Sequence, residues 1–240
     1  MKNNTWVVLC IFATLLVACD QMISGGVKGT GSVEKETRDV KDFKGVNLMS
    51  TGTVFLKKSN TFSVVVETHK NIAELLETVN DNGVLKIRFK NNIGNIHYDK
   101  LNIYVEAPTI ETIDLSGSGD MSADNAISNA GLDIDLSGSG RIELKEGGYT
   151  QLTANLGGSG SIVLSGTAEK ATYAITGSGN IDMKNVKAKT VKAEITGSGN
   201  IYCHADAALD ALVTGSGDIQ YSGDAIVKSR VTGSGSIDKK

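Results

Sequence analysis

Three aspartates stand at positions where carboxylates from successive segments of the chain could come together. Asp114 and Asp135 each lie three residues before the first glycine of a Gly-Ser-Gly triplet, and Asp133 lies two residues before Asp135. In neighbouring parallel strands, Asp114 and Asp135 would stack about 5 Å apart on one face. A hard cation such as Ca²⁺ would relieve the repulsion between them. The alternative is a set of carboxylates that point separately into water. We expect that alternative, and therefore no metal site.

Cys203 and His204 are adjacent, and a cysteine activated by an imidazole is a common nucleophile. Adjacent residues of a strand point to opposite faces, however, so the two side chains could not meet within one strand. The alternation of the surrounding sequence places Cys203 in the core and His204 toward solvent. His69 and His97 have no partner at the spacing typical of metal ligands. We therefore expect no catalytic residue and no cofactor.

The Gly-Ser-Gly triplets invite comparison with phosphate-binding loops. A dinucleotide-binding loop needs a third glycine within a strand-helix-strand unit, and neither follows the triplets. No Gly-Lys-Ser/Thr sequence occurs, which excludes a P-loop. Calcium-binding nonapeptides repeat an aspartate, whereas here the residue after the triplet is Asp, Arg, Ser or Asn. The triplets therefore indicate a structural role.

The triplet recurs at a nearly constant period, with its first glycine at 117, 138, 158, 177, 197, 215 and 233. The residue two before it is aliphatic in every copy, the residue four after it is apolar, and the positions between are mostly polar. Such period-two alternation predicts half-buried strands. A unit of about 19 residues buries its apolar face only by stacking on its neighbours, and glycine suits the corner between strands. We predict an all-β fold, a single-stranded parallel β-helix over residues 111–240. The corner serines would form a ladder: Ser118, Ser139, Ser159, Ser178, Ser198, Ser216 and Ser234.

Residues 33–110 lack the triplet but contain similar alternating segments. The sequence around Gly52 looks like a degenerate first corner. We expect this β-rich part to begin and cap the solenoid, because an uncapped end exposes strand edges. Helical spacing predicts one short helix within it, through Ile72, Leu75, Leu76 and Val79.

The N-terminal segment indicates export. Lys2 is followed by an apolar run from Trp6 to Ala18, which is too short to span a membrane and is typical of a signal peptide. The run ends in Leu-Val-Ala-Cys19, which resembles the lipobox of bacterial lipoproteins; this implies cleavage before Cys19 and attachment of lipid to its sulfur. We predict a signal peptide over 1–18, a lipidated Cys19 and a flexible Gly/Ser-rich tether over 19–32. The expected location is the bacterial cell envelope, with the outer membrane as the anchoring membrane.

The order and spacing of several motifs resemble one known family. They are Arg38, Phe43–Val46, Gly52, Val64–Glu67, Asn71, Gly83–Ile87 and the run LSGSGD at 115–120 with its ITGSGN and VTGSGD repeats. Over residues 36–237 the chain resembles the putative auto-transporter adhesin, head GIN domain family. The resemblance implies a right-handed parallel β-helix in an exported protein, often a lipoprotein of Bacteroidetes. It implies no catalytic residues.

Composition narrows the function. The chain has 24 basic and 27 acidic residues, so it has no basic excess for nucleic acid. We expect a non-enzymatic envelope lipoprotein, an adhesin or binding module, held at the membrane by its lipid and binding an unknown protein or glycan. One alternative is a periplasmic structural or accessory lipoprotein. Another is a polysaccharide-active β-helix enzyme, which the low aromatic content of 5% disfavours. The oligomeric state does not follow from the sequence.

Overall fold

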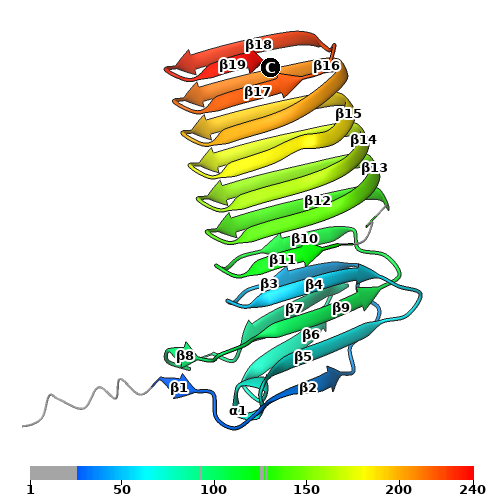
Figure 1. Cartoon of the computed structure of the whole chain (residues 1–240), viewed down its shortest axis with the longest axis vertical. Coiled ribbons are helices and arrows are strands. Elements are labelled where there is room, and N and C mark those ends of the chain that lie inside the picture. Colours follow the sequence, from blue (N-terminus) through cyan, green and yellow to red (C-terminus); the bar gives the residue numbers. More distant parts are fainter. Residues whose placement is uncertain (1–25, 92, 125–126, 128) are drawn as a thin grey trace, which may run out of the picture.

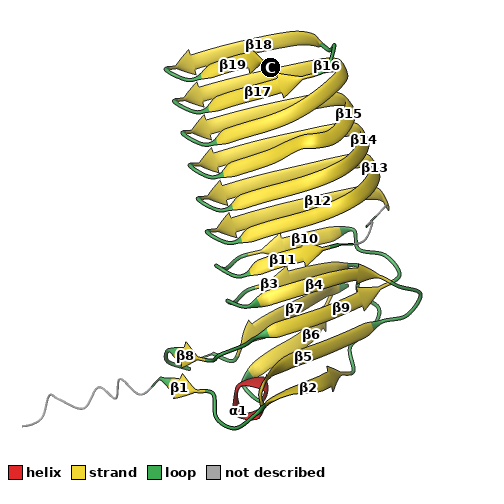
Figure 2. Cartoon of the chain, in the orientation of Figure 1, coloured by secondary structure: helices red, strands yellow, loops and turns green. Residues whose placement is uncertain are grey.

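The computed structural model describes residues 26–91, 93–124, 127 and 129–240, and it shows one elongated stack of strands (Figure 1). Strands make up most of it, joined by loops and accompanied by one short helix in the described part of the chain (Figure 2). Seventeen strands form one continuous sheet, and β1 and β8 form a separate pair. The predicted signal peptide and Cys19 lie outside the described residues.

The repeats form parallel coils in register, as the triplet spacing predicts. Successive coils pair residue for residue, so that Leu136 lies beside Leu156 and Gly138 beside Gly158. The strands of this part are β10 (Thr112–Leu115), β11 (Asp120–Ala123), β12 (Asn129–Gly138), β13 (Arg141–Gly158), β14 (Ser161–Gly177), β15 (Asn180–Gly197), β16 (Asn200–Gly215), β17 (Asp218–Ser222), β18 (Ile226–Gly233) and β19 (Ser236–Lys239). The predicted parallel β-solenoid is therefore confirmed.

Aligned apolar columns fill the interior of the coils. One of them runs through Leu136, Leu156, Ile175, Ile195 and Val213, each no more than 2% exposed. Burial of each such side chain contributes about 1.5–3 kcal/mol. A side chain of this column is fully buried only where a coil packs on each side of it. The next member, Val231 in β18, is 41% exposed.

Glycine is required at the corners because successive coils approach one another closely there. Gly177 has a φ of +136°, and a Cβ on it would lie 2.4 Å from the carbonyl oxygen of Gly158 in the coil below. Backbone hydrogen bonds connect the corners, as from Ser178 N to Gly158 O at 2.9 Å. The seven corner serines lie in the turns between strands. Among the described residues, no hydrogen bond joins two of their hydroxyls.

The N-terminal part continues the coils and then closes them. The strands β3 (Gly45–Leu48) and β4 (Thr53–Lys58) pair in parallel with β10 and β11, and the turn at Gly52 stacks on the first triplet through Asp120 N to Gly52 O at 2.8 Å. On their other side lie β7 (Val84–Phe89) and β9 (Asn102–Ala107), also parallel. The direction then reverses, since β5 (Ser63–His69) runs antiparallel to β9, β2 (Val33–Arg38) to β5, and β6 (Leu76–Asp81) to β7.

The predicted helix is shorter than expected. The helix α1 covers Lys70–Ala73, and Leu76 already begins β6, which contains Val79. Leu76 is buried whereas Val79 is 42% exposed, so the four apolar residues do not share one buried helical face. Pairing with β7 overrides the helical spacing here, because the sheet edge offers partners to the backbone that a short isolated helix lacks.

We call the N-terminal part of the fold, residues 33–110, the cap. The described part of the predicted tether lies against it. The strand β1 (Val27–Lys28) pairs in parallel with β8 (Ile96–His97), and Thr30 N donates to Asn71 Oδ1 at 3.0 Å. Residues 27–31 are therefore held in place, and the expectation of a flexible tether does not apply to them.

Candidate functional site

The three aspartates of the candidate cation cluster lie where their register predicts. Asp114 pairs with Asp135, and Asp133 lies beside Thr112. An amide serves each of the stacked carboxylates: Asn47 Nδ2 donates to Asp114 Oδ2 at 2.7 Å, and Asn155 Nδ2 donates to Asp135 Oδ1 at 2.9 Å.

Burial is the largest cause of the shifted pKa of Asp114 in this stack. Partial burial raises the pKa of Asp114, the hydroxyl of Ser116 opposes this effect, and the charge of Asp135 adds to it. In the described part of the chain, no group of three or more His, Cys, Asp or Glu side chains has a geometry that could hold a metal ion. The stack therefore acts as a hydrogen-bonded row on the outer face.

Cys203 and His204 point to opposite sides of β16, as alternation predicts. Cys203 lies in the core between Met183 and Tyr221, is 1% exposed, and burial raises the pKa of its thiol to about 12. His204 lies outside, where its Nδ1 hydrogen-bonds with Ser222 Oγ at 2.9 Å and its Nε2 with Asp206 Oδ1 at 2.8 Å. A thiol held neutral inside the core cannot serve as the nucleophile of this pair.

His69 has a partner that the sequence did not reveal. The ring is 5% exposed; its Nε2 lies 3.2 Å from Asp99 Oδ2, and its Nδ1 lies 3.0 Å from the carbonyl oxygen of Gly31. This His-Asp pair contacts a backbone carbonyl where a catalytic triad would have a nucleophile. It therefore fastens the segment that carries β1 to the cap. Asp99 and Gly31 lie far from His69 in the sequence, so no spacing between neighbouring residues could have predicted this contact. His97, in contrast, is exposed in β8.

Aromatic side chains reach the outer surface both in the cap and in the coils. In the cap, the rings of Phe55 and Tyr104 stack with centroids 5.2 Å apart, and Lys35 Nζ lies 5.0 Å from the centre of the Tyr104 ring. Hydrogen bonds from Lys100 and from the Tyr104 hydroxyl lower the pKa of Glu67, which completes this cluster. Among the tyrosines of the coils, Tyr149 and Tyr173 are buried, whereas Tyr202 belongs to an outward-facing column.

The column of Tyr202 borders a recess of about 390 Å³ near the C-terminal end of the solenoid. Asp182, Tyr202 and Gln220 occupy equivalent positions on β15, β16 and β17. The recess is lined by Asp182, Lys184, Tyr202, Cys203, Gln220, Tyr221, Ser222 and Lys240. A second, more open depression of about 420 Å³ lies over the outer surface of β14, β15, β16 and β18, near Lys170, Lys192 and Ile226.

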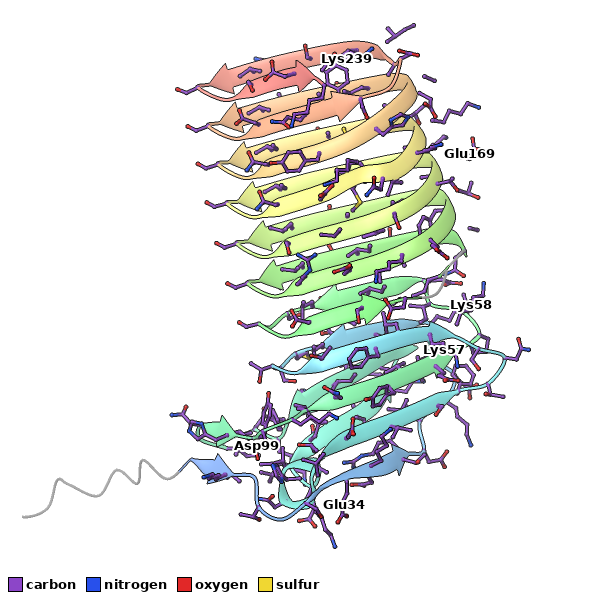
Figure 3. All side chains as sticks on the ribbon, viewed as in Figure 1. Glu34, Lys57, Lys58, Asp99, Glu169 and Lys239 are labelled. Atoms are coloured by element: carbon purple, nitrogen blue, oxygen red, sulfur yellow. The ribbon has the colours of Figure 1, made fainter. Side chains whose placement is uncertain are left out.

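Side chains cover the outer surface along its whole length (Figure 3). Many of the charged ones are paired, for example Lys184 with Asp182 at 2.8 Å, Lys192 with Glu194 at 2.9 Å and Lys57 with Glu106 at 3.0 Å. Pairing of opposite charges leaves these faces polar without a strong field of either sign. No described helix is long and apolar enough to cross a membrane.

Comparisons with solved structures bear on this architecture. A putative adhesin from Bacteroides fragilis superimposes with a TM-score of 0.86 at 26% identity, over 90% of this chain and 100% of the other. A putative lipid binding protein and a putative adhesin, both from Parabacteroides distasonis, share the fold with TM-scores of 0.76 and 0.72 at 24% and 22% identity. Each of these two alignments covers 90% of this chain and 100% of the other. A search of curated proteins found no match.

The family model gives the most direct assignment. It covers residues 42–225, which include the core strands of the cap and all but the last of the seven triplets. The motifs that carried the resemblance from Phe43 onward lie inside this range. Gly52 and the Gly-Ser-Gly triplets build the stacked corners, whereas Val64–Glu67 and Asn71 belong to β5 and α1 of the cap. The chain therefore belongs to the putative auto-transporter adhesin, head GIN domain family.

Proposed function

We propose that this protein is a non-enzymatic binding module of the bacterial cell envelope, an adhesin held at the outer membrane by lipid on Cys19. The observation that carries the proposal is the stack of coils, which presents outward columns of polar side chains at a fixed spacing of about 4.8 Å. A rigid repetitive surface of this kind suits recognition of an extended partner, as in other solenoids.

Two further features support a role in binding over catalysis. The residues that could have formed a nucleophilic pair, Cys203 and His204, face opposite sides of their strand. The solved relative at 26% identity is itself a putative adhesin. An adhesin must also reach its partner, and a lipid anchor followed by a folded rod would provide this reach.

Location is the property that tests the proposal first. Intact cells that express the protein are treated with a protease, with lysed cells as the positive control and a periplasmic protein as the control for intact membranes. Cleavage in intact cells is expected. Protection in intact cells together with cleavage after lysis would contradict the adhesin and favour a periplasmic accessory lipoprotein.

Anchoring is tested separately at Cys19. The parent and the Cys19→Ser variant are grown with an alkyne-bearing fatty acid, and the label on each protein is detected after coupling to a fluorophore. Label on the parent and its loss in the variant are expected. An unlabelled parent, or a labelled variant, would contradict lipidation at Cys19.

A further inference from the structure

The recess beside Tyr202 arises from a change in the length of the repeat. The triplet-to-triplet interval is 20 residues between 177 and 197 but 18 residues in each of the next two coils. The pairing of β15 with β16 passes from Met183–Cys203 directly to Lys187–His204, so three residues of β15 have no counterpart in β16. The longer coil therefore bulges at residues 184–186, and this bulge forms a ledge that places Lys184 at the border of the recess.

The floor and wall of the recess combine an aromatic ring with polar groups. Tyr202 lies between Asp182 and Gln220 in its column and is partly exposed. The neighbouring strand β17 contributes Gln220 and Ser222, and the ledge contributes Lys184. An aromatic face next to amide, hydroxyl and ammonium groups suits a ligand that has both an apolar surface and several hydroxyls.

The charges and hydrogen-bonding groups of the recess restrict the class of ligand further. Lys184 Nζ lies 2.8 Å from Asp182 Oδ2, so these two charges offset each other at the ledge, and Lys240 is the other charged residue in the lining. The side-chain oxygen of Gln220 is buried without a hydrogen-bond partner. A buried acceptor of this kind is usually satisfied, and rotation of the Gln220 side chain toward the recess would bring the oxygen to a ligand hydroxyl.

We propose that this recess binds one ring of a neutral saccharide. The apolar face of a pyranose would pack on Tyr202, one hydroxyl would donate to Gln220 Oε1, and another would accept from Lys184. This assignment rests on the proposed function as a binding module and names the class of its ligand. With one aromatic contact and a shallow site, we expect a Kd of about 1–10 mM for a single sugar.

Saturation-transfer difference NMR on the full-length protein in detergent micelles tests this directly. The probes are methyl β-D-galactopyranoside, methyl α-D-mannopyranoside and N-acetylglucosamine, with sodium glucuronate as the charged comparison. Transfer to the ring protons of at least one neutral probe is expected. Transfer to none of the three, or to glucuronate alone, would overturn the proposal.

Variants locate the site. Tyr202→Ala and Gln220→Ala should each weaken binding by about tenfold or more, since aromatic packing and a buried hydrogen bond contribute on that order. Val163→Ala is the matched control, because Val163 faces outward in the same column two coils away and does not line the recess. Thermal melts check that all three variants fold.

Binding that survives Tyr202→Ala, in a variant that melts like the parent, would place any sugar elsewhere and refute the assignment. The protease experiment on intact cells separates this failure from failure of the proposed function. A surface-exposed protein that binds none of the sugars would remain an adhesin candidate for another class of ligand, whereas a protected protein would lose the adhesin role whatever it binds.

Discussion

The cap of residues 33–110 and the coils of residues 111–240 share one sheet but are held together differently. In the coils, each contact recurs in the next turn: Ile142, Ile162 and Ile181 occupy one column, and each is fully buried by its neighbours. In the cap, single contacts occur once, such as Arg38 Nη2 donating to the carbonyl oxygen of Ala73 at 2.6 Å. Repetition makes the coils depend on their neighbours, whereas the cap depends on particular side chains.

The edge of the cap shows why its sequence departs from the repeat. In β2, Glu34 and Glu36 pair with Thr68 and Val66, so they belong to the face on which β5 buries its side chains. Charged residues on the inward face of an edge strand disfavour the addition of another strand. The cap therefore ends the stack, whereas each coil offers strand edges with which the next coil pairs.

The largest expected effect is a cavity in the middle of the coils. Ile162→Ala should lower the free energy of unfolding by about 3 kcal/mol, within the range of 2–5 kcal/mol for buried aliphatic truncations. Val231→Ala is the comparison, because Val231 is 41% exposed in β18 and should cost less than about 1 kcal/mol. Urea denaturation measures both. Equal losses would contradict the idea that each coil is stabilised by packing between two others.

The next effect concerns the corners. Gly177→Ala should cost about 2–3 kcal/mol, because the new Cβ meets the Gly158 carbonyl oxygen at 2.4 Å and the backbone has a φ of +136°. Gly157→Ala is the matched control on the same edge, since a Cβ there meets no atom within 4 Å and should change stability by about 0.5 kcal/mol or less. If both alanines are tolerated, the corners do not need their glycines.

A smaller and more local effect is expected in the cap. Arg38→Ala removes the hydrogen bond to Ala73 and should cost about 1–2 kcal/mol. Hydrogen exchange should accelerate in β2 and α1 and stay unchanged in β14 and β15. Lys41→Ala is the control, because its pairing with Asp39 is exposed to water. Faster exchange in the coils as well would show that cap and coils open as one unit.

The smallest effect lies at the seam between the two regions, where Asn47 of the cap meets Asp114 of the coils. Burial raises the pKa of Asp114, so the folded protein holds this proton more tightly than the unfolded chain does. The charged carboxylate therefore lowers stability as the pH rises above about 4.

Asp114→Asn removes this charge, and its amide could donate to Asp135. The variant should be more stable than the parent at pH 7 by no more than about 1 kcal/mol, and this advantage should vanish below about pH 3. Thermal melts across this pH range measure the difference. A variant that is less stable at pH 7 would show that the carboxylate stack stabilises the seam.

Much of the coil region could be predicted from residue order. Alternation at period two and the triplet spacing correctly identified the columns that contain Cys203 and Ile162, because a parallel stack pairs each residue with its equivalent one repeat away. The same argument correctly placed Asp114 beside Asp135. The cap was less predictable from the sequence. The spacing of Leu76 and Val79 predicted a helix, but these residues form a strand that pairs with β7.

Sequence by itself determined the solenoid, its register and its corners, since a repeating pattern states which residues become neighbours. Only the tertiary structure decided the antiparallel closure of the cap, the contact of His69 with Asp99, and the recess at Tyr202. The shorter repeats were visible as two intervals of 18 residues, but the side that recedes depends on where β15 bulges. Contacts that occur once, between residues far apart in the chain, produce no repeating pattern in the sequence. Three-dimensional packing alone brings these residues together.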